Sequence, residues 1–106
     1  MAFSEFYQLN DIVLAQIKDR TGNYRLKKTM NGPVVYVGRS DSELAKRIWS
    51  HIQEGYKAFS YQYCDSPIAA FHQECADYHD FNSTINNKIH PACPKGLYLK
   101  CPVCHQ

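Results

Sequence analysis

The sequence lacks the features that mark several broad classes of protein. None of its apolar runs reaches the roughly 18 residues that a membrane-spanning helix needs, and no basic segment followed by an apolar one opens the chain. We therefore expect a cytoplasmic protein that does not enter a membrane. The chain also has no internal repeat and no low-complexity segment, which argues against a solenoid and against a disordered protein.

The chain has little excess of either charge. Twelve Lys and Arg face ten Asp and Glu, which leaves a net charge of +2, too small to indicate nucleic-acid binding by itself. The basic excess is confined to residues 1–50, where eight Lys and Arg face five Asp and Glu. The rest of the composition is that of a globular protein, with 44% hydrophobic residues. We expect residues 1–106 to form a single domain with its own core.

The number of cysteines is odd. Five cysteines cannot all form disulfides with one another, and two of them, Cys101 and Cys104, form a C-x-x-C pair near several histidines. This pattern is more typical of metal-binding thiols in a reducing compartment than of a disulfide framework.

The spacing of apolar residues predicts an α/β (α+β) fold. Phe59, Tyr61 and Tyr63 alternate as in a half-buried strand, and Asn31-Gly32 is typical of the turn in a β-hairpin. We predict a small, three-stranded, mainly antiparallel sheet flanked by helices. In order, the predicted elements are a helix over 3–17, strands over 23–30 and 34–37, a helix from about 41, a strand over 59–63, a helix from 67 to about 81, and a polar tail over 88–106.

The predicted helix after the hairpin places an arginine and a histidine together. Ser40 and Glu43 have the spacing of a capping box, so we expect the helix to begin at about Asp41. Arg47 and His51 are four residues apart and therefore share one face. We expect this face to lie beside the end of the strand over 34–37.

Several residues, taken in order, resemble the GIY-YIG nuclease superfamily. Tyr36-Val37-Gly38 matches the second motif in the superfamily's name, and Gly22-Asn23-Tyr24 matches the first, with Asn23 where an aliphatic residue is usual. The resemblance covers roughly residues 22–87, which would be the nuclease-like core. The segments YVGRSD, ECxxYH and CPxC resemble those of a small uncharacterised subgroup of that superfamily.

The resemblance implies a metal-dependent endonuclease that hydrolyses phosphodiester bonds in DNA. It implies a tyrosine as the base, Arg47 as the catalytic arginine, His51 as the active-site histidine, and Glu74 as the carboxylate that holds Mg²⁺ or Mn²⁺. It does not decide between Tyr24 and Tyr36, and His51 is an alternative base. Asn86 or Asn87 would supply the late asparagine of the pattern; we take Asn87, together with Arg39, as candidate substrate-binding residues.

The tail predicts a second, structural metal site. The two-residue spacing of Cys101 and Cys104 lets both thiolates reach one Zn²⁺. Cys75 and His79 are four apart on the last predicted helix, so they could complete a tetrahedral Cys3His set. Three further residues are rivals for the fourth position: His90, Cys93 and His105.

Three hypotheses for the function follow from these residues. The first is the endonuclease with a structural zinc site, and the second is a zinc-stabilised module that binds nucleic acid or a protein without cutting. A redox role for Cys101 and Cys104 is less favoured, because no βαβ pattern surrounds the pair. Nucleic acid, in the first instance DNA, is the expected partner; a protein partner or an oligomer is left open. Trp49 is expected in the core or at an interface.

Overall fold

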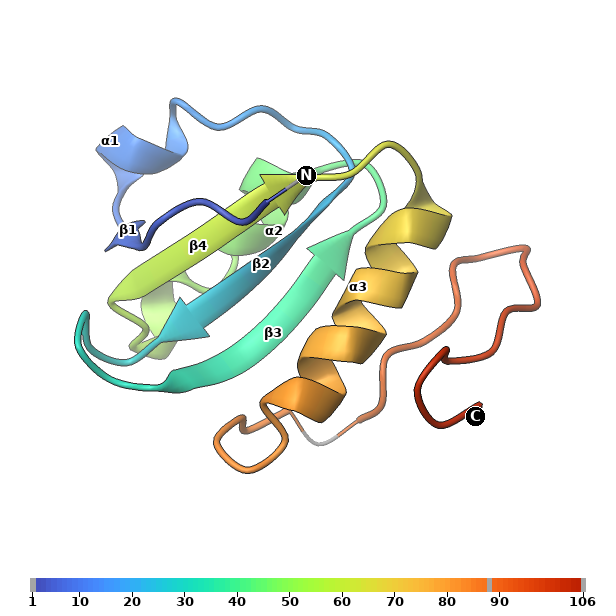
Figure 1. The fold of residues 1–106 in the computed structure, drawn as a ribbon. Helices are drawn as coiled ribbons and strands as arrows, with labels where there is room; N and C mark the ends of the chain where they lie inside the picture. Colours follow the sequence, from blue (N-terminus) through green and yellow to red (C-terminus); the bar gives the residue numbers. More distant parts are fainter. Residues whose placement is uncertain (1, 88, 106) are drawn as a thin grey trace.

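One antiparallel sheet organises the computed structural model, which describes residues 2–87 and 89–105 (Figure 1). In these residues the sheet has four strands in the order β1-β4-β2-β3. The prediction of a mainly antiparallel sheet is confirmed, but the predicted number of three strands is wrong. The strands are β1 (Tyr7–Gln8), β2 (Gly22–Lys27), β3 (Val34–Ser40) and β4 (Ala58–Tyr63).

The predicted helix over 3–17 is wrong, because this segment contains the two-residue strand β1, a single helical turn and otherwise irregular chain. Tyr7 pairs with Phe59 of β4, and their rings lie 6.1 Å apart. The only helix here is the single turn α1 (Asp11–Leu14), capped by the side chain of Asn10. The helical spacing of apolar residues is misleading, because Phe3 packs under the guanidinium group of Arg25 at 3.7 Å instead of joining a helix face.

The predicted hairpin is confirmed, but β2 ends at Lys27 and not at residue 30, so residues 28–33 connect the two strands. β2 and β3 pair on either side of Asn31-Gly32, with Tyr24 opposite Gly38 and Leu26 opposite Tyr36. β3 continues through Gly38 to Ser40, so this glycine does not end the strand. Tyr24 and Tyr36 therefore project from the same face of adjacent strands.

Helices cover both faces of the sheet. α2 (Leu44–Trp49) packs on β2 and β3 and is followed by the 3-10 turn η1 (Ile52–Glu54). α3 (Pro67–Asp80) packs on the same two strands from the other face (Figure 1). Ser66 caps α3 through the backbone N–H of Ala69, and Pro67 takes its first turn, as predicted.

The core lies mainly between the sheet and α2. Buried side chains from both layers form it, including Leu26, Leu44, Ile48 and Phe59. On the opposite face, Asn23 is fully buried and donates to the carbonyl oxygen of Ala70 in α3 at 2.9 Å. This bond explains how a polar residue is accommodated where the nuclease pattern has an aliphatic one: it ties α3 to the centre of the sheet.

Candidate functional site

Tyr24 and His51 form a buried hydrogen bond on the α2 face of the sheet. The Tyr24 hydroxyl lies 2.9 Å from Nε2 of His51, and both residues are less than 10% exposed. Helix α2 ends at Trp49, so His51 lies two residues beyond the helix that carries Arg47. The backbone turn into η1 sets the position of His51. Burial, followed by the neighbouring Tyr36 hydroxyl, raises the pKa of Tyr24 well above its ordinary value.

Gly38 makes room for the Tyr24 ring. A Cβ atom at Gly38 would lie 2.4 Å from Cζ and 2.5 Å from the hydroxyl oxygen of Tyr24. Real Cβ atoms do not approach other atoms so closely. The glycine of the Tyr36-Val37-Gly38 motif is therefore needed for space beneath the phenol, and not for a turn.

Tyr36 stacks beside this pair and is more exposed to solvent. Its ring centroid lies 6.2 Å from that of Tyr24 and 4.7 Å from that of His51. Burial is the largest cause that raises the pKa of Tyr36, and the negative charge of Glu74 adds to it. Arg47 acts in the opposite direction on both tyrosines. Tyr24, Tyr36, Arg47 and Glu74 therefore share one electrostatic environment.

Arg47 and Glu74 meet at a pocket near the end of β3. This pocket has a volume of about 230 Å³ and is lined by Arg39, Asp41, Arg47, Glu74 and Ala92. It brings together α2, α3 and the tail. Two arginines and two carboxylates at one opening can bind a phosphate group and a divalent cation side by side.

Arg39 pairs with the predicted metal-binding carboxylate. Its Nη1 donates to Oε1 of Glu74 at 2.6 Å, and its Nε donates to Oδ1 of Asp41 at 2.8 Å. Burial nevertheless raises the pKa of Glu74, although Arg39 acts to lower it. Glu74 thus presents a carboxylate oxygen, the kind of ligand that hard cations prefer, at an open pocket where Arg39 already binds it.

Asn87 has a structural role in this arrangement. Its side-chain oxygen accepts from the backbone N–H of Val37 at 3.0 Å, and its Nδ2 donates to the Val37 carbonyl oxygen at 2.9 Å. The amide thus completes the outer edge of β3 as another strand would. These two hydrogen bonds explain the position of the Asn87 side chain, with no need for a bound substrate.

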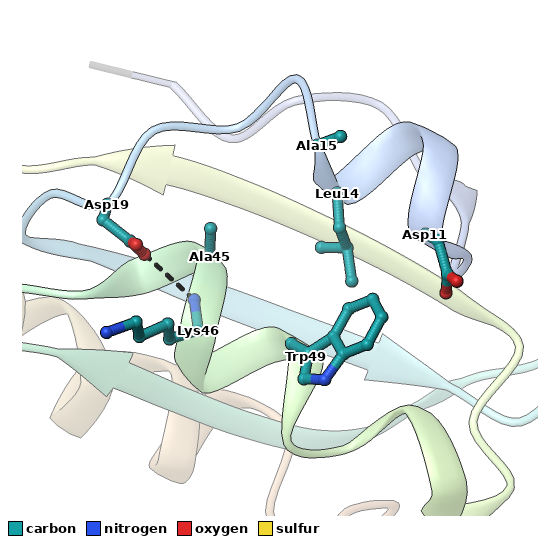
Figure 2. Close-up of a pocket in the computed structure, with 7 residues that line it drawn as sticks. All are labelled: Asp11, Leu14, Ala15, Asp19, Ala45, Lys46 and Trp49. Carbon is teal, nitrogen blue, oxygen red and sulfur yellow. Dashed lines mark hydrogen bonds between the residues drawn. The ribbon is translucent and has the colours of Figure 1, made fainter.

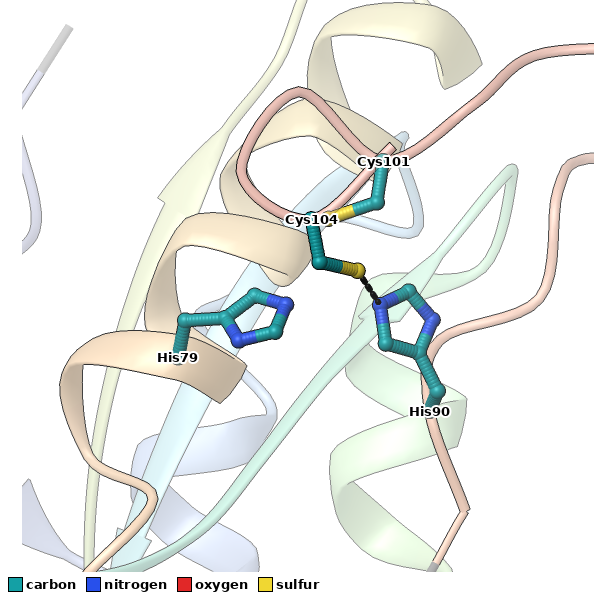
Figure 3. A group of neighbouring side chains, drawn as sticks. All are labelled: His79, His90, Cys101 and Cys104. Carbon is teal, nitrogen blue, oxygen red and sulfur yellow. Dashed lines mark hydrogen bonds between the residues drawn. The ribbon is translucent and has the colours of Figure 1, made fainter. Parts of the chain in front are cut away.

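A second group of side chains gathers between α3 and the tail (Figure 3). One ligand atom from each of His79, His90, Cys101 and Cys104 lies within 4.8 Å of all the others. Cys104 Sγ lies 3.5 Å from His90 Nε2, which is about the separation of sulfur and nitrogen ligands around a tetrahedral Zn²⁺. The group could hold a metal such as zinc.

Cys75 was predicted as a ligand, but it lies outside this group, and His90 takes its place. Cys75 is fully buried and packs against Phe71, while its thiol hydrogen-bonds to Cys101. Burial raises the pKa of Cys75 to about 12. An i, i+4 pair aligns two side chains only roughly, and here Cys75 is drawn toward the core.

Two details support a cation at this second site. Among the described residues, Nε2 of His79 is buried and has no hydrogen-bond partner, which is costly unless a ligand is bound there. Burial raises the pKa of Cys101, but hydrogen bonds from the backbone N–H groups of Cys104 and Val103 and from two side chains outweigh it and bring the pKa to about 5. The thiolate form, which binds metals, is therefore favoured.

Trp49 is only half buried and borders an apolar hollow between α1 and α2 (Figure 2). The hollow has a volume of about 230 Å³. Asp19 holds one side of it by accepting from the backbone N–H of Lys46 at 3.0 Å. Trp49 therefore contributes to a surface and not to the core.

Comparison with known proteins adds no relative: no family model, curated protein or solved structure matches the chain. Within the residues that the structure describes, no helix is both long and apolar enough to cross a membrane.

The sequence reasoning missed two partners of the site residues. Oε1 of Glu54 lies 3.0 Å from Nδ1 of His51, and Oδ1 of Asp41 accepts from Nε of Arg39. A glutamate three residues after a histidine is a signal in the sequence that could have indicated the first contact. The Arg39 and Asp41 pair, two residues apart at the end of a strand, gives no comparable signal.

Proposed function

We propose that this protein is a metal-dependent endonuclease that hydrolyses phosphodiester bonds in DNA and that carries a structural zinc site in its tail. The observation that carries the proposal is that Tyr24, Tyr36 and His51 pack together, while Arg47 and Glu74 meet at the neighbouring pocket and act electrostatically on both tyrosines. These residues come from β2, β3, α2, the turn into η1, and α3. An ordered series that resembles a nuclease pattern is thereby supported by proximity in space.

The residues divide the work of hydrolysis between them. Arg47 offers two parallel N–H donors to a phosphate and stabilises the charge that develops on it. Tyr24 is better placed than Tyr36 to act as the base, because its hydroxyl has a hydrogen-bonded acceptor in His51. Tyr36, which is more exposed, would orient the attacking water. Glu74 would hold Mg²⁺ or Mn²⁺, which supplies positive charge to the phosphoryl oxygens.

Arg39 makes Glu74 responsive to substrate. The guanidinium group of Arg39 pairs with Glu74 at 2.6 Å. A phosphate entering the pocket would compete for Arg39, and a cation would compete for Glu74. Each side chain would keep a partner of opposite charge, because Arg39 would pair with the phosphate and Glu74 with the cation.

His79, His90, Cys101 and Cys104 would hold Zn²⁺ as a closed tetrahedral site. Four protein ligands leave no open position, so the metal would stabilise the fold and take no part in hydrolysis. Because the unfolded chain has no such site, metal binding would contribute directly to the stability of the tail.

The experiment is a plasmid-nicking assay with supercoiled DNA and added Mg²⁺ or Mn²⁺. Cleavage should require the cation and should be lost in Glu74→Gln. Arg47→Ala should reduce the rate by about 10²–10³-fold, which is typical of losing one preorganised charge donor. Matched controls are Glu5→Gln and Arg20→Ala, which remove the same groups from exposed residues that do not line the pocket. Cleavage that survives both site variants would refute the assignment.

The Arg39 to Glu74 contact also favours one alternative, a zinc-stabilised module that binds nucleic acid or a protein without cutting. In that case the ion pair would be permanent, and Glu74 would never bind a cation. DNA binding without cleavage under any metal condition would support this alternative over the nuclease.

A further inference from the structure

A carboxylate outside the predicted series extends the hydrogen bond between Tyr24 and His51. Oε1 of Glu54 lies 3.0 Å from Nδ1 of His51, whose Nε2 lies 2.9 Å from the Tyr24 hydroxyl. Glu54 ends η1, three residues after His51, so a single 3-10 turn brings them together. We propose that Glu54 is a positioning residue that fixes the tautomer of His51 and so directs Nε2 to accept the proton of Tyr24.

The tautomer follows from what each group can donate. An ionised carboxylate can only accept, so Nδ1 of His51 must carry the hydrogen that bonds to Glu54. In a neutral imidazole the other nitrogen then has a free lone pair and no hydrogen. Nε2 of His51 is therefore the acceptor, and the Tyr24 hydroxyl is the donor. Without Glu54, either nitrogen could carry the hydrogen.

The surroundings of His51 give the tautomer its importance. The imidazole is only 7% exposed and is enclosed by three phenol rings, those of Tyr24, Tyr36 and Tyr56, at centroid distances of 5.5, 4.7 and 6.0 Å. Among the described residues, four charged side chains face these rings. Glu54, Arg47 and Glu74 act on the pKa values of Tyr24 and Tyr36, and Nζ of Lys28 lies 4.4 Å from the Tyr56 ring centroid. Glu54 and Tyr24 are the hydrogen-bond partners of the two ring nitrogens, so they set which nitrogen carries the hydrogen.

The proposed role rests on the nuclease function and completes its proton balance. As water attacks phosphorus, it gives a proton to the Tyr24 oxygen while the Tyr24 proton passes to Nε2 of His51. A phosphorus–oxygen bond forms to the water oxygen and another breaks to the leaving oxygen, which takes a proton from solvent. The imidazolium then bears a positive charge that Glu54 balances across Nδ1, and it returns its proton to solvent.

The first test needs no enzymatic activity. Imidazole nitrogens of ¹⁵N-histidine-labelled protein, measured by NMR, distinguish the two neutral tautomers. We expect wild-type His51 to be protonated at Nδ1, and Glu54→Ala to shift toward protonation at Nε2, whereas the control Glu5→Ala leaves the pattern unchanged. Protonation of wild-type His51 at Nε2, or an unchanged pattern in Glu54→Ala, would overturn the proposal.

The second test is kinetic. Glu54→Ala should lower kcat for DNA cleavage by at least about tenfold with KM little changed, because Glu54 acts through His51 and not on the substrate. An unchanged kcat, or a rise in KM alone, would refute the role. If the wild type cuts no DNA, the nuclease function fails instead, and the tautomer of His51 alone then decides whether Glu54 positions it.

Discussion

Substituting Gly38 tests the packing on which the whole candidate site depends. The new methyl group of Gly38→Ala would lie 2.4 Å from Cζ and 2.9 Å from Cε1 of Tyr24. Tyr24 cannot move aside easily, because it is only 2% exposed and packs in the main core. Such crowding typically costs about 1–3 kcal/mol, whereas Ala in place of Gly in an uncrowded strand would stabilise it by about 0.5–1 kcal/mol.

The expected loss corresponds to a fall in Tm of about 5–15 °C for a domain of this size. Denaturant unfolding of four proteins gives the energy of the contact itself: wild type, Gly38→Ala, Tyr24→Leu and the double variant. Leucine keeps the inner part of the side chain but lacks Cζ, Cε1 and the hydroxyl oxygen. In the Tyr24→Leu background, Gly38→Ala should therefore become neutral or stabilising.

The effect of Gly38→Ala in the Tyr24→Leu background shows whether the glycine is required by the Tyr24 ring. If Gly38→Ala destabilises equally in both backgrounds, then the glycine is required by the backbone and not by the phenol. The explanation given for the motif glycine would then be wrong.

Three further outcomes are expected. Elemental analysis should find one zinc per chain, which is lost in His90→Ala but kept in Cys75→Ala; the opposite pattern would restore Cys75 as a ligand. Because the pKa of Tyr24 is raised in the folded protein, its stabilising contribution should be complete below pH 10, the ordinary tyrosine pKa, and fall as the pH rises above it. Between pH 9 and pH 11, the free energy of unfolding should fall less in Tyr24→Phe than in the wild type. It should fall less than in the control Tyr98→Phe too, which alters a fully exposed ring. Equal losses in all three proteins would contradict the burial argument. Asn87→Ala should lower the free energy of unfolding by about 1–2 kcal/mol, because it leaves the N–H and C=O groups of Val37 unpaired; unchanged stability would mean that water replaces the amide at no cost.

Local signals predicted the parts of the fold that are themselves local. The turn at Asn31-Gly32 and the capping Ser66 act on residues within a few positions, so the hairpin and α3 appear where the sequence indicates. Strand β1 has no such signal. Its two residues are extended because β4, some fifty positions later, supplies their partners and the Phe59 ring. Tertiary pairing overrides an apolar spacing that is helical only by coincidence.

The same distinction applies to the candidate site. The sequence series named the residues near the end of β3, but it could not show that Arg39 binds Glu74 or that Asn87 binds β3. Both contacts join positions at least thirty-five residues apart. In the tail, spacing alone selected Cys75 beside His79, whereas the path of residues 89–93 determines that His90 is the nearer ligand.

The tail is part of the candidate site and not an appendage to it. Ala92 lines the pocket that contains Arg47 and Glu74, and His90 is among the groups that act to lower the pKa of Glu74. His90 also belongs to the Cys/His group that could bind a metal. A cation held there would fix the segment between these two residues, and with it one wall of the pocket. In this arrangement a metal that takes no part in the proposed chemistry would still determine the shape of the pocket in which that chemistry would occur.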